Sequence, residues 1–482
     1  MKTLALLAAL ALTACATARQ APPTQVQPER PEILELRAIA GEVSEDAMRA
    51  TVERLVSFGT RHTLSSRDHP TRGIGAALRW TEAELGRTSA ACGGCLEVVR
   101  IGETVTGRRI PQPTLVENVV AIQRGTERPD QVVIITGHID SRVTDVMDSA
   151  ADAPGANDDG SGTAAVIEAA RVLSRRRFPA TIVYAALSGE EQGLVGGRIL
   201  AGFARARGWQ VIANFNNDII GNVCGSDGTC DAAHVRVFSE GPRWQGGEAL
   251  RPLQRSLGGE NDSPSRNVSR FLDRLAERLD LGLDVRQIWR IDRFGRGGDH
   301  VELLDAGFPA VRLSVAVENY DHQHQDVRVE NGIPYGDTID RMDFPYLRRV
   351  TQLNVAALAA LARAPMPPEP LAEGALANDT TIMWLPVPGA ARYRVYWRRT
   401  DLAQWDSSGE YPLEARRCAD SGVAIESCPA GRIRQAAVLL GIRVDDYVFG
   451  VASVSADGWE SPVASAVPGG AFRPWTPPPG AQ

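Results

Sequence analysis

The sequence predicts an α/β domain, with a mostly parallel mixed sheet and helices on both faces, followed by a small all-β sandwich. Three observations support this prediction. Short β-branched segments alternate with helix-like ones over most of the chain, a Pro-rich stretch begins at Ala364, and the residues beyond it alternate with the period of two typical of strands. We therefore expect a larger domain at 35–363, a linker at 364–374, a sandwich at 375–468 and a disordered tail at 469–482.

The first residues are typical of an export signal. Lys2 precedes an apolar run from Leu4 to Leu12, and Leu12-Thr13-Ala14-Cys15 resembles the lipobox of bacterial lipoproteins. The resemblance implies that 1–15 is a signal peptide and that a lipid on Cys15 anchors a periplasmic or cell-surface protein to the membrane. An ordinary secretory signal is the alternative, because the run is too short to span a bilayer. Residues 16–34 are then expected to be a flexible tether.

Composition narrows the class of protein. The chain has 482 residues, of which 43% are apolar, so it is long enough for two domains or more. Its net charge of −7 disfavours nucleic acid as a partner.

Apart from Cys15, the cysteines form three close pairs. In an oxidising compartment such pairs predict disulfides that close short loops: Cys92 with Cys95, Cys224 with Cys230, and Cys418 with Cys428. Cys92 and Cys95 could instead be half of a thiolate zinc site, although the sequence has no second Cys-x-x-Cys to complete it.

The larger domain begins with two helical patterns. Apolar residues recur at helical spacing between Val43 and Phe58, behind Ser44, a residue that favours the N-cap. A second helix is expected from about Thr71 to Leu85.

Three segments after these helices are typical of buried parallel strands: Gln131 to Thr136, Thr181 to Leu187 and Ala310 to Val315. A packed helix is expected between the first two, from Thr163 to Arg175. Because strand, crossover helix and strand form a parallel unit, this order predicts a sheet covered on both faces.

Imidazole and carboxylate side chains follow the predicted strands or precede the crossover helix: His138, Asp158, Glu190, Glu191, Asp218 and His324. Open α/β sheets bind ligands at the carboxyl ends of their strands, so we expect these side chains to converge. Such a mixed nitrogen and oxygen set suits zinc. The sequence therefore predicts a metal-dependent hydrolase.

Five strings that contain these residues resemble the co-catalytic di-zinc aminopeptidases, family 28 of the metallopeptidases. They are Gly137-His138-Ile139-Asp140, the string from Gly155 to Gly162, Gly189-Glu190-Glu191-Gln192-Gly193-Leu194, Asn217-Asp218 and His324-Gln325-Asp326. The resemblance covers about residues 115 to 360 and implies the zinc exopeptidase fold with two Zn²⁺ ions. It implies that Asp158 bridges the ions, that His138 and Asp218 complete one ligand shell, and that Glu191 and His324 complete the other.

The same resemblance assigns Asp140 and Glu190. Asp140 would orient the imidazole of His138, and Glu190 would be the general base. Two cations about 3.5–4 Å apart hold a hydroxide between them and lower its pKa, but they move no proton to the leaving amine. Glu190 could take a proton from the water and return it to that amine.

Some assignments stay open. His322 competes with His324 as a ligand, and Asp159 could replace Asp158 if the Gly-rich turn is shifted by one residue. His300 is expected to be structural or to face substrate. The other histidines have no convergent partners and are expected to be structural or on the surface: His62, His69 and His234.

Beyond the linker, strand-like segments lie at Thr381 to Trp384, Tyr393 to Trp397 and Tyr447 to Val454. With the string from Gly458 to Pro462 they resemble a fibronectin type III module. We expect this module to be a spacer or a contact surface, because it contains no constellation of reactive groups.

Together these patterns predict an exported zinc exopeptidase acting on peptides, with aminopeptidase activity as the first hypothesis. A carboxypeptidase or dipeptidase on the same scaffold is one alternative, and a positively charged pocket for a substrate carboxylate would favour it. A glutaminyl cyclase with one zinc ion and a non-catalytic binding protein with a vestigial site are the others. Zinc content per chain separates the cyclase from the di-zinc enzymes.

Overall fold

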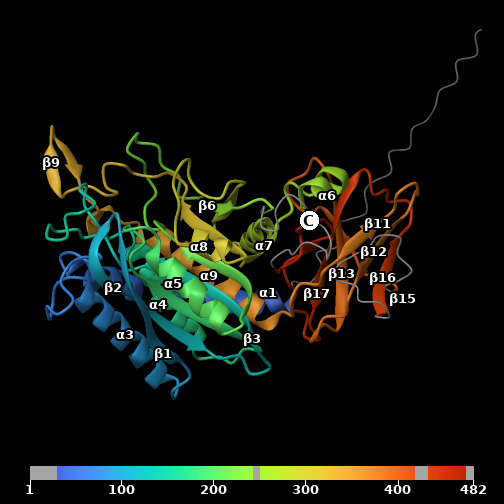
Figure 1. Ribbon diagram of the computed structural model, residues 1–482, viewed down its shortest axis with the longest axis horizontal. Coiled ribbons are helices and arrows are strands. Elements are labelled where there is room, and N and C mark those ends of the chain that lie inside the picture. Colours follow the sequence, from blue (N-terminus) through green and yellow to red (C-terminus); the bar gives the residue numbers. More distant parts are fainter. Residues whose placement is uncertain (1–29, 243–249, 418–432, 474–482) are drawn as a thin grey trace, which may run out of the picture.

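The computed structural model describes residues 30–242, 250–417 and 433–473, which form an α/β domain beside a β-sandwich (Figure 1). Cys15 and the pair of Cys418 and Cys428 lie outside the described residues. Within the described part of the chain, no helix combines the length and the apolar character needed to cross a membrane.

The α/β domain is built on a sheet with the strand order β1-β2-β4-β3-β5-β8-β6-β7. Its central strands are parallel: β4 (Ala180–Leu187), β3 (Arg128–His138), β5 (Gln210–Asn217) and β8 (Ala310–Val315). The flanking strands are β1 (Glu97–Gly107), β2 (Ile110–Gln123), β6 (His234–Ser239) and β7 (Asp284–Ile288). The pairs β1–β2, β2–β4 and β6–β8 are antiparallel, whereas β6 and β7 pair in parallel. The predicted mostly parallel mixed sheet is confirmed.

Helices cover both faces because the central strands are apolar on both sides. Val133 and Ile135 face one core, whereas Val132 and Ile134 face the other. The first core is covered by α1 (Pro31–Gly41), α2 (Glu45–Val56), α3 (Ile74–Ala91), α4 (Gly160–Leu173), α7 (Pro264–Leu279) and α9 (Phe344–Arg363). The second is covered by α5 (Val195–Ala206) and α8 (His300–Asp305).

The helix ends differ in part from the predictions. Ser44 is the N-cap of α2, and its side chain accepts a hydrogen bond from Ala47 N–H. The helix predicted from about Thr71 begins at Ile74 and continues to Ala91. The predicted tether at 16–34 ends earlier than expected, because α1 begins at Pro31 and buries its apolar side in the first core.

The sandwich contains two antiparallel sheets, β11-β12-β16-β15 and β14-β13-β17-β18. Its strands are β11 (Leu371–Glu373), β12 (Thr380–Trp384), β13 (Arg392–Arg399), β14 (Ser407–Gly409), β15 (Glu414–Arg417), β16 (Ile433–Leu439), β17 (Tyr447–Val454) and β18 (Ala464–Ser465). Ile382 and Trp384 of the first sheet share a core with Val395 and Phe449 of the second. β11 lies inside the predicted linker, because its backbone pairs with the edge of β12.

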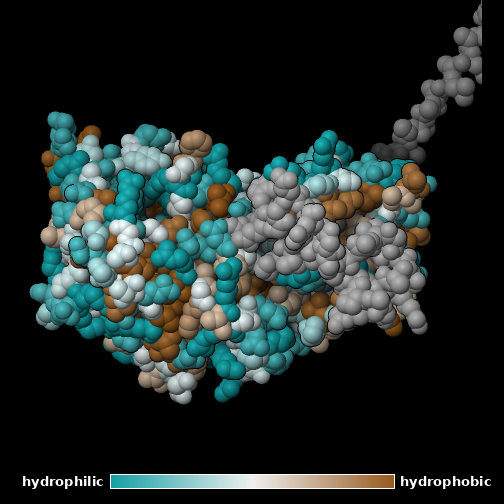
Figure 2. Space-filling model, viewed as in Figure 1, coloured by the Kyte–Doolittle hydropathy of each residue, from teal (hydrophilic) through white to brown (hydrophobic). Residues whose placement is uncertain are grey.

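Shorter elements complete the chain: α6 (Leu250–Leu257), β9 (Arg328–Glu330), β10 (Ile333–Tyr335) and η2 (Ile339–Arg341). The β9–β10 hairpin projects from the end of the α/β domain opposite the sandwich (Figure 1). Hydrophilic and apolar side chains are interspersed over the face of the α/β domain that Figure 2 shows.

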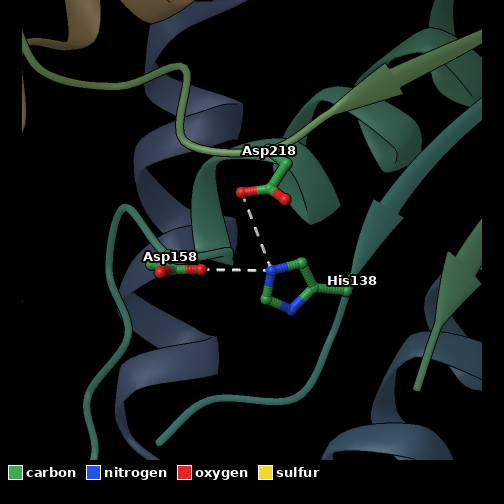
Figure 3. Close-up of side chains that lie close together, drawn as sticks. All are labelled: His138, Asp158 and Asp218. Carbon is green, nitrogen blue, oxygen red and sulfur yellow. Dashed lines mark ion pairs between the residues drawn. The ribbon is translucent and has the colours of Figure 1, made fainter. Parts of the chain in front are cut away.

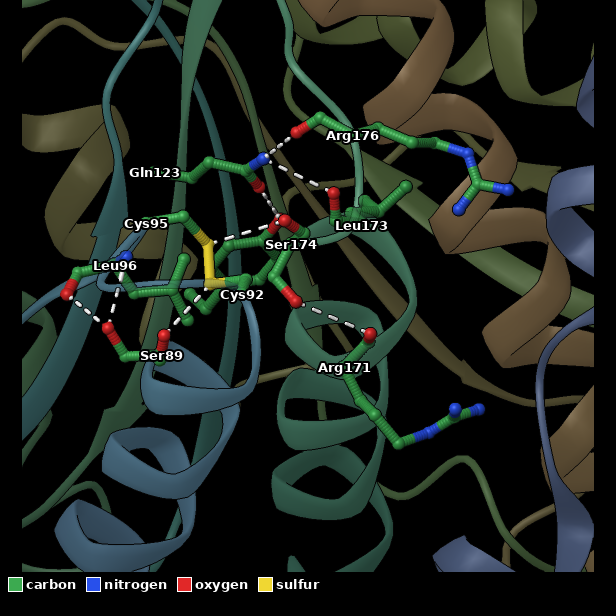
Figure 4. Close-up of a disulfide and its surroundings, with 10 residues drawn as sticks. Ser89, Cys92, Cys95, Leu96, Gln123, Arg171, Leu173, Ser174 and Arg176 are labelled. Atoms are coloured by element: carbon green, nitrogen blue, oxygen red, sulfur yellow. Dashed lines mark hydrogen bonds between the residues drawn. A yellow bond between two sulfur atoms is a disulfide. The ribbon is translucent and has the colours of Figure 1, made fainter.

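Two of the three predicted disulfides are present, Cys92–Cys95 and Cys224–Cys230. Cys92–Cys95 lies where α3 ends, and Cys95 Sγ is 3.3 Å from the carbonyl oxygen of Ser174 at the end of α4 (Figure 4). Because both sulfurs are bonded to each other, the alternative of a thiolate zinc site at Cys92 and Cys95 is wrong.

Candidate metal centre

The parallel strands bring the predicted ligands to one edge of the sheet. His138 is the last residue of β3, Asp218 directly follows β5, and Glu191 lies in the loop after β4. Asp158 lies in the loop that enters α4. The carboxyl ends of neighbouring parallel strands meet at the same edge, so residues far apart in the sequence become neighbours.

His138, Asp158 and Asp218 form the first group (Figure 3). The Nε2 atom of His138 is 3.1 Å from Asp158 Oδ1 and 3.9 Å from Asp218 Oδ1. One ligand atom from each residue lies within 4.8 Å of the others, and all three residues are buried. This spacing is suited to a single cation between them.

Asp158, Glu191 and His324 form the second group. The Nε2 atom of His324 is 2.9 Å from Asp158 Oδ2 and 3.1 Å from Glu191 Oε1. Asp158 therefore presents one oxygen to each imidazole, and its carboxylate is shared by the two groups. The backbone of His324 has φ of 58°, a conformation that is uncommon for residues other than glycine.

The chemistry of these groups fits zinc. Imidazole nitrogens and carboxylate oxygens are its ordinary ligands. Glu191 Oε1 is buried and lies 3.1 Å from His324 Nε2, so an oxygen and a nitrogen that can each bind a cation face one another there. His138, Asp158 and Asp218 would hold one ion, and Asp158, Glu191 and His324 the other.

Asp140 supports the centre by contacts that the sequence did not show. The Nδ1 atom of His138 is 3.0 Å from the backbone oxygen of Asp140 and 3.6 Å from its carboxylate. The Asp140 carboxylate accepts hydrogen bonds from Thr63 Oγ1 and from the backbone N–H groups of Glu190 and Glu191. Asp140 thus links the imidazole of His138 to the loop after β4.

Glu190 lies beside the first group. One of its carboxylate oxygens is within 4.8 Å of ligand atoms of His138 and Glu191. Burial raises the pKa of Glu190 well above its usual value, although His138 lowers it. A carboxyl group at this position can exchange a proton with a water molecule held between it and the ligand groups.

The carboxylate of Asp159 caps α4 instead of joining the two groups. It accepts hydrogen bonds from Gly162 N–H at 2.8 Å and from His138 N–H at 2.9 Å. Glycine is required at 162, because a Cβ there would lie 2.1 Å from the backbone oxygen of Asn217. Among the residues described, Asp158 supplies ligand atoms to both groups and Asp159 to neither.

The other histidines lie outside the ligand groups found among the described residues. His322 lines a small adjoining pocket with Asp158, and its pKa is lowered by burial and by Arg341. The Nε2 atom of His300 is 2.8 Å from the backbone oxygen of Ile291. The rest contact nearby backbone or carboxylate groups: His62, His69 and His234.

Three residues at the centre were missed in the sequence. Asp337 accepts hydrogen bonds from the backbone of Asp158, Arg142 contacts both Glu191 and His324, and Arg312 pairs with Asp218 at 2.8 Å. The sequence could have indicated Arg312, because an arginine in the apolar segment that forms β8 needs a buried partner. Asp337 and Arg142 lie in segments without a recognisable pattern.

The charges of the metal-free centre are strongly coupled. Burial raises the pKa of Asp218 to about 7, partly offset by His138. Burial by itself lowers the pKa of His324, but Glu191 and Asp158 raise it to about 10. The metal-free centre therefore holds protons that cations would displace.

Known proteins are similar to this chain in sequence and in fold. A sequence model described as peptidase family M28 matches residues 118–235. The chain is 41% identical to a protein named "probable zinc metalloprotease" from Leptosphaeria maculans, over 90% of this chain and 97% of the relative. It is 40% identical to one of the same name from Pyricularia oryzae, over 95% and 90% of the two chains.

Among solved structures, the LapA aminopeptidase of Legionella pneumophila is similar, with a TM-score of 0.51 and 20% identity over 68% of this chain and 75% of that chain. The similarity to the Legionella structure shows a shared fold.

Proposed function

This chain belongs to peptidase family M28 as a zinc metalloprotease, and we propose that it acts as an aminopeptidase that uses two zinc ions. The observation that carries the proposal is the position of Asp158, whose two oxygens face the imidazoles of His138 and His324. The fold shared with the Legionella aminopeptidase is consistent with it.

In the proposed hydrolysis, Glu190 and Asp140 have different roles. When bound, divalent cations activate water and polarise the carbonyl of a peptide bond. Glu190 accepts a proton from the attacking water and donates it to the leaving amine. Asp140 holds the backbone of Glu190 and the ring of His138 in one geometry, so the base and the ligand keep a constant separation.

Hydrolysis of a peptide panel by the full chain tests this proposal. Peptides with a free N-terminus should lose their first residue, N-acetylated peptides should stay intact, and a chelator should abolish the reaction until zinc is restored. Two zinc ions per chain are expected by elemental analysis. Release of the C-terminal residue, or cleavage of the acetylated peptides, would contradict aminopeptidase activity.

We also propose that the protein is exported and anchored through a lipid on Cys15. The two disulfides support export, because they form in oxidising compartments. Substitution of Cys15 by Ser should release the protein from the membrane fraction. A protein that stays reduced and cytoplasmic would refute export.

The sandwich is proposed to be a fibronectin type III-like spacer. Its two antiparallel sheets and shared apolar core support this.

A further inference from the structure

Four arginines line the cleft over the candidate metal centre: Arg109, Arg142, Arg293 and Arg296. The acidic residues of the lining are those of the centre itself: Asp158, Glu190, Glu191 and Asp218. Two divalent cations would balance these four carboxylates, so no carboxylate of the lining would then be left to neutralise the arginines. This charge is local, because the whole chain has a net charge of −7.

Two of the arginines are engaged with the protein. Arg293 has a side chain that is 9% exposed, and it donates hydrogen bonds to Asp292, Glu318 and the backbone of Gly297. Arg142 contacts Glu191 at 2.8 Å and His324 Nδ1 at 2.5 Å, so its guanidinium group holds two residues of the candidate metal centre in place.

The other two arginines are accessible. The side chain of Arg296 is 34% exposed and contacts Glu318 at 3.0 Å through one nitrogen. Glu318 also pairs with Arg236 and Arg293, so Arg296 shares its carboxylate partner with two other guanidinium groups.

Arg109 lies in the turn between β1 and β2 and is exposed. Its Nη1 atom donates a hydrogen bond to the backbone oxygen of Glu191 at 2.9 Å. The carboxylate of Glu191 pairs with Arg142 and His324, so Arg109 meets the uncharged backbone oxygen of this residue. Its guanidinium is therefore held beside a proposed ligand residue without pairing with the carboxylate of that residue.

We propose that Arg109 and Arg296 select substrates that carry a carboxylate near the scissile bond. A guanidinium group binds a carboxylate through paired, charge-assisted hydrogen bonds, and a cleft of one sign of charge concentrates ligands of the opposite sign. The carboxylate belongs either to the side chain of an acidic residue or to the C-terminus of a short peptide. This inference rests on the proposed peptidase function and names its substrate class.

The test measures binding separately from turnover. The full-length, zinc-loaded Glu190→Gln variant is titrated by calorimetry with tripeptides that differ in one carboxylate: Ala-Ala-Ala amide, Glu-Ala-Ala amide, Ala-Glu-Ala amide and Ala-Ala-Ala with a free C-terminus. We expect at least one carboxylate-bearing peptide to bind about tenfold more tightly than the neutral amide. The preferred peptide identifies the source of the carboxylate. Salt should reduce the preference, because the contacts are partly exposed.

Added Arg109→Gln and Arg296→Gln substitutions should each remove most of that preference. Arg108→Gln is the matched control, since Arg108 lies in the same turn and is absent from the lining of the cleft. Equal binding of all four peptides, or a preference that survives both substitutions, would overturn the inference. Failure of the native protein to hydrolyse any of the four peptides would instead count against the proposed function, so the two results are separable.

Discussion

The backbone N–H of Asp158 donates a hydrogen bond to Oδ2 of Asp337 across 2.7 Å, although the two residues are 179 positions apart. The N–H of Asn157 donates to both oxygens of the same carboxylate, at 2.9 and 3.0 Å. Asp337 follows the β9–β10 hairpin, so this segment holds the loop that carries the Asp158 carboxylate. The position of Asp158 therefore depends on a residue outside the ligand groups found among the described residues.

Substitution of Asp337 by Ala should weaken zinc binding. The two backbone N–H groups would lose their acceptor, and the loop of Asp158 would be free to move. Loss of such a supporting contact lowers metal affinity by about 10–100-fold. Competition with a chromogenic chelator measures this affinity. Zinc affinity equal to that of the native protein would show that the loop keeps its geometry without Asp337.

Glu190→Gln should retain zinc and lose turnover, because the amide cannot accept a proton from water. A loss of about 10²–10⁴-fold in kcat is expected. Glu191→Gln is the comparison, since it replaces a proposed ligand and should reduce zinc content. Both quantities are measured on the same preparations by elemental analysis and peptide hydrolysis. An active, zinc-replete Glu190→Gln protein would remove Glu190 from the mechanism.

His324→Ala should lower the zinc content by one ion per chain, whereas His322→Ala should leave it unchanged. His324 Nε2 faces Asp158 and Glu191, while His322 contributes to none of the ligand groups among the described residues. Elemental analysis after dialysis distinguishes the two variants. The reverse pattern would assign the ligand position to His322.

Zinc uptake at pH 7 should release protons. Burial lowers the pKa of His324, but Glu191 and Asp158 raise it to about 10, so Nε2, which faces both carboxylates, carries a proton at pH 7 in the metal-free protein. Nε2 must lose this proton to bind a cation, so zinc affinity should fall as the pH is lowered. Calorimetry in two buffers with different ionisation enthalpies counts the released protons. Uptake without proton release would contradict the raised pKa.

The buried pair of Arg398 and Asp262 should hold the sandwich on the α/β domain. Arg398 Nη2 is 2.8 Å from each carboxylate oxygen of Asp262, and both side chains are buried. Arg398→Ala should lower the free energy of unfolding by about 3 kcal/mol, because it leaves a buried carboxylate with only weaker partners. Thermal unfolding measures the loss.

Arg399→Ala is the control for that experiment. The neighbouring Arg399 pairs with Asp401 on the surface, where both side chains are exposed, so no measurable change in Tm is expected. Equal Tm values for the two variants would show that the buried pair does not stabilise the docked sandwich.

Local patterns in the sequence determined the elements and the kinds of ligand. Apolar β-branched runs predicted β3, β4 and β8, because strands buried on both faces have that composition. The order of imidazole and carboxylate strings along these strands indicated the chemistry, since parallel strands end at one edge of the sheet. The positions of α1 and β11 were missed, because a short helix and an edge strand depend on surfaces that the rest of the chain provides.

Only the tertiary structure decided which side chains meet. Asp337 reaches Asp158, and Arg109 and Arg296, which lie far apart in the sequence, line the same cleft. His322 and His324 differ by two positions and have the same chemistry, so the turn of the backbone separates their roles. Local sequence specifies periodicity and the types of functional group, whereas hydrogen bonds and charge contacts across more than a hundred residues require the packed fold.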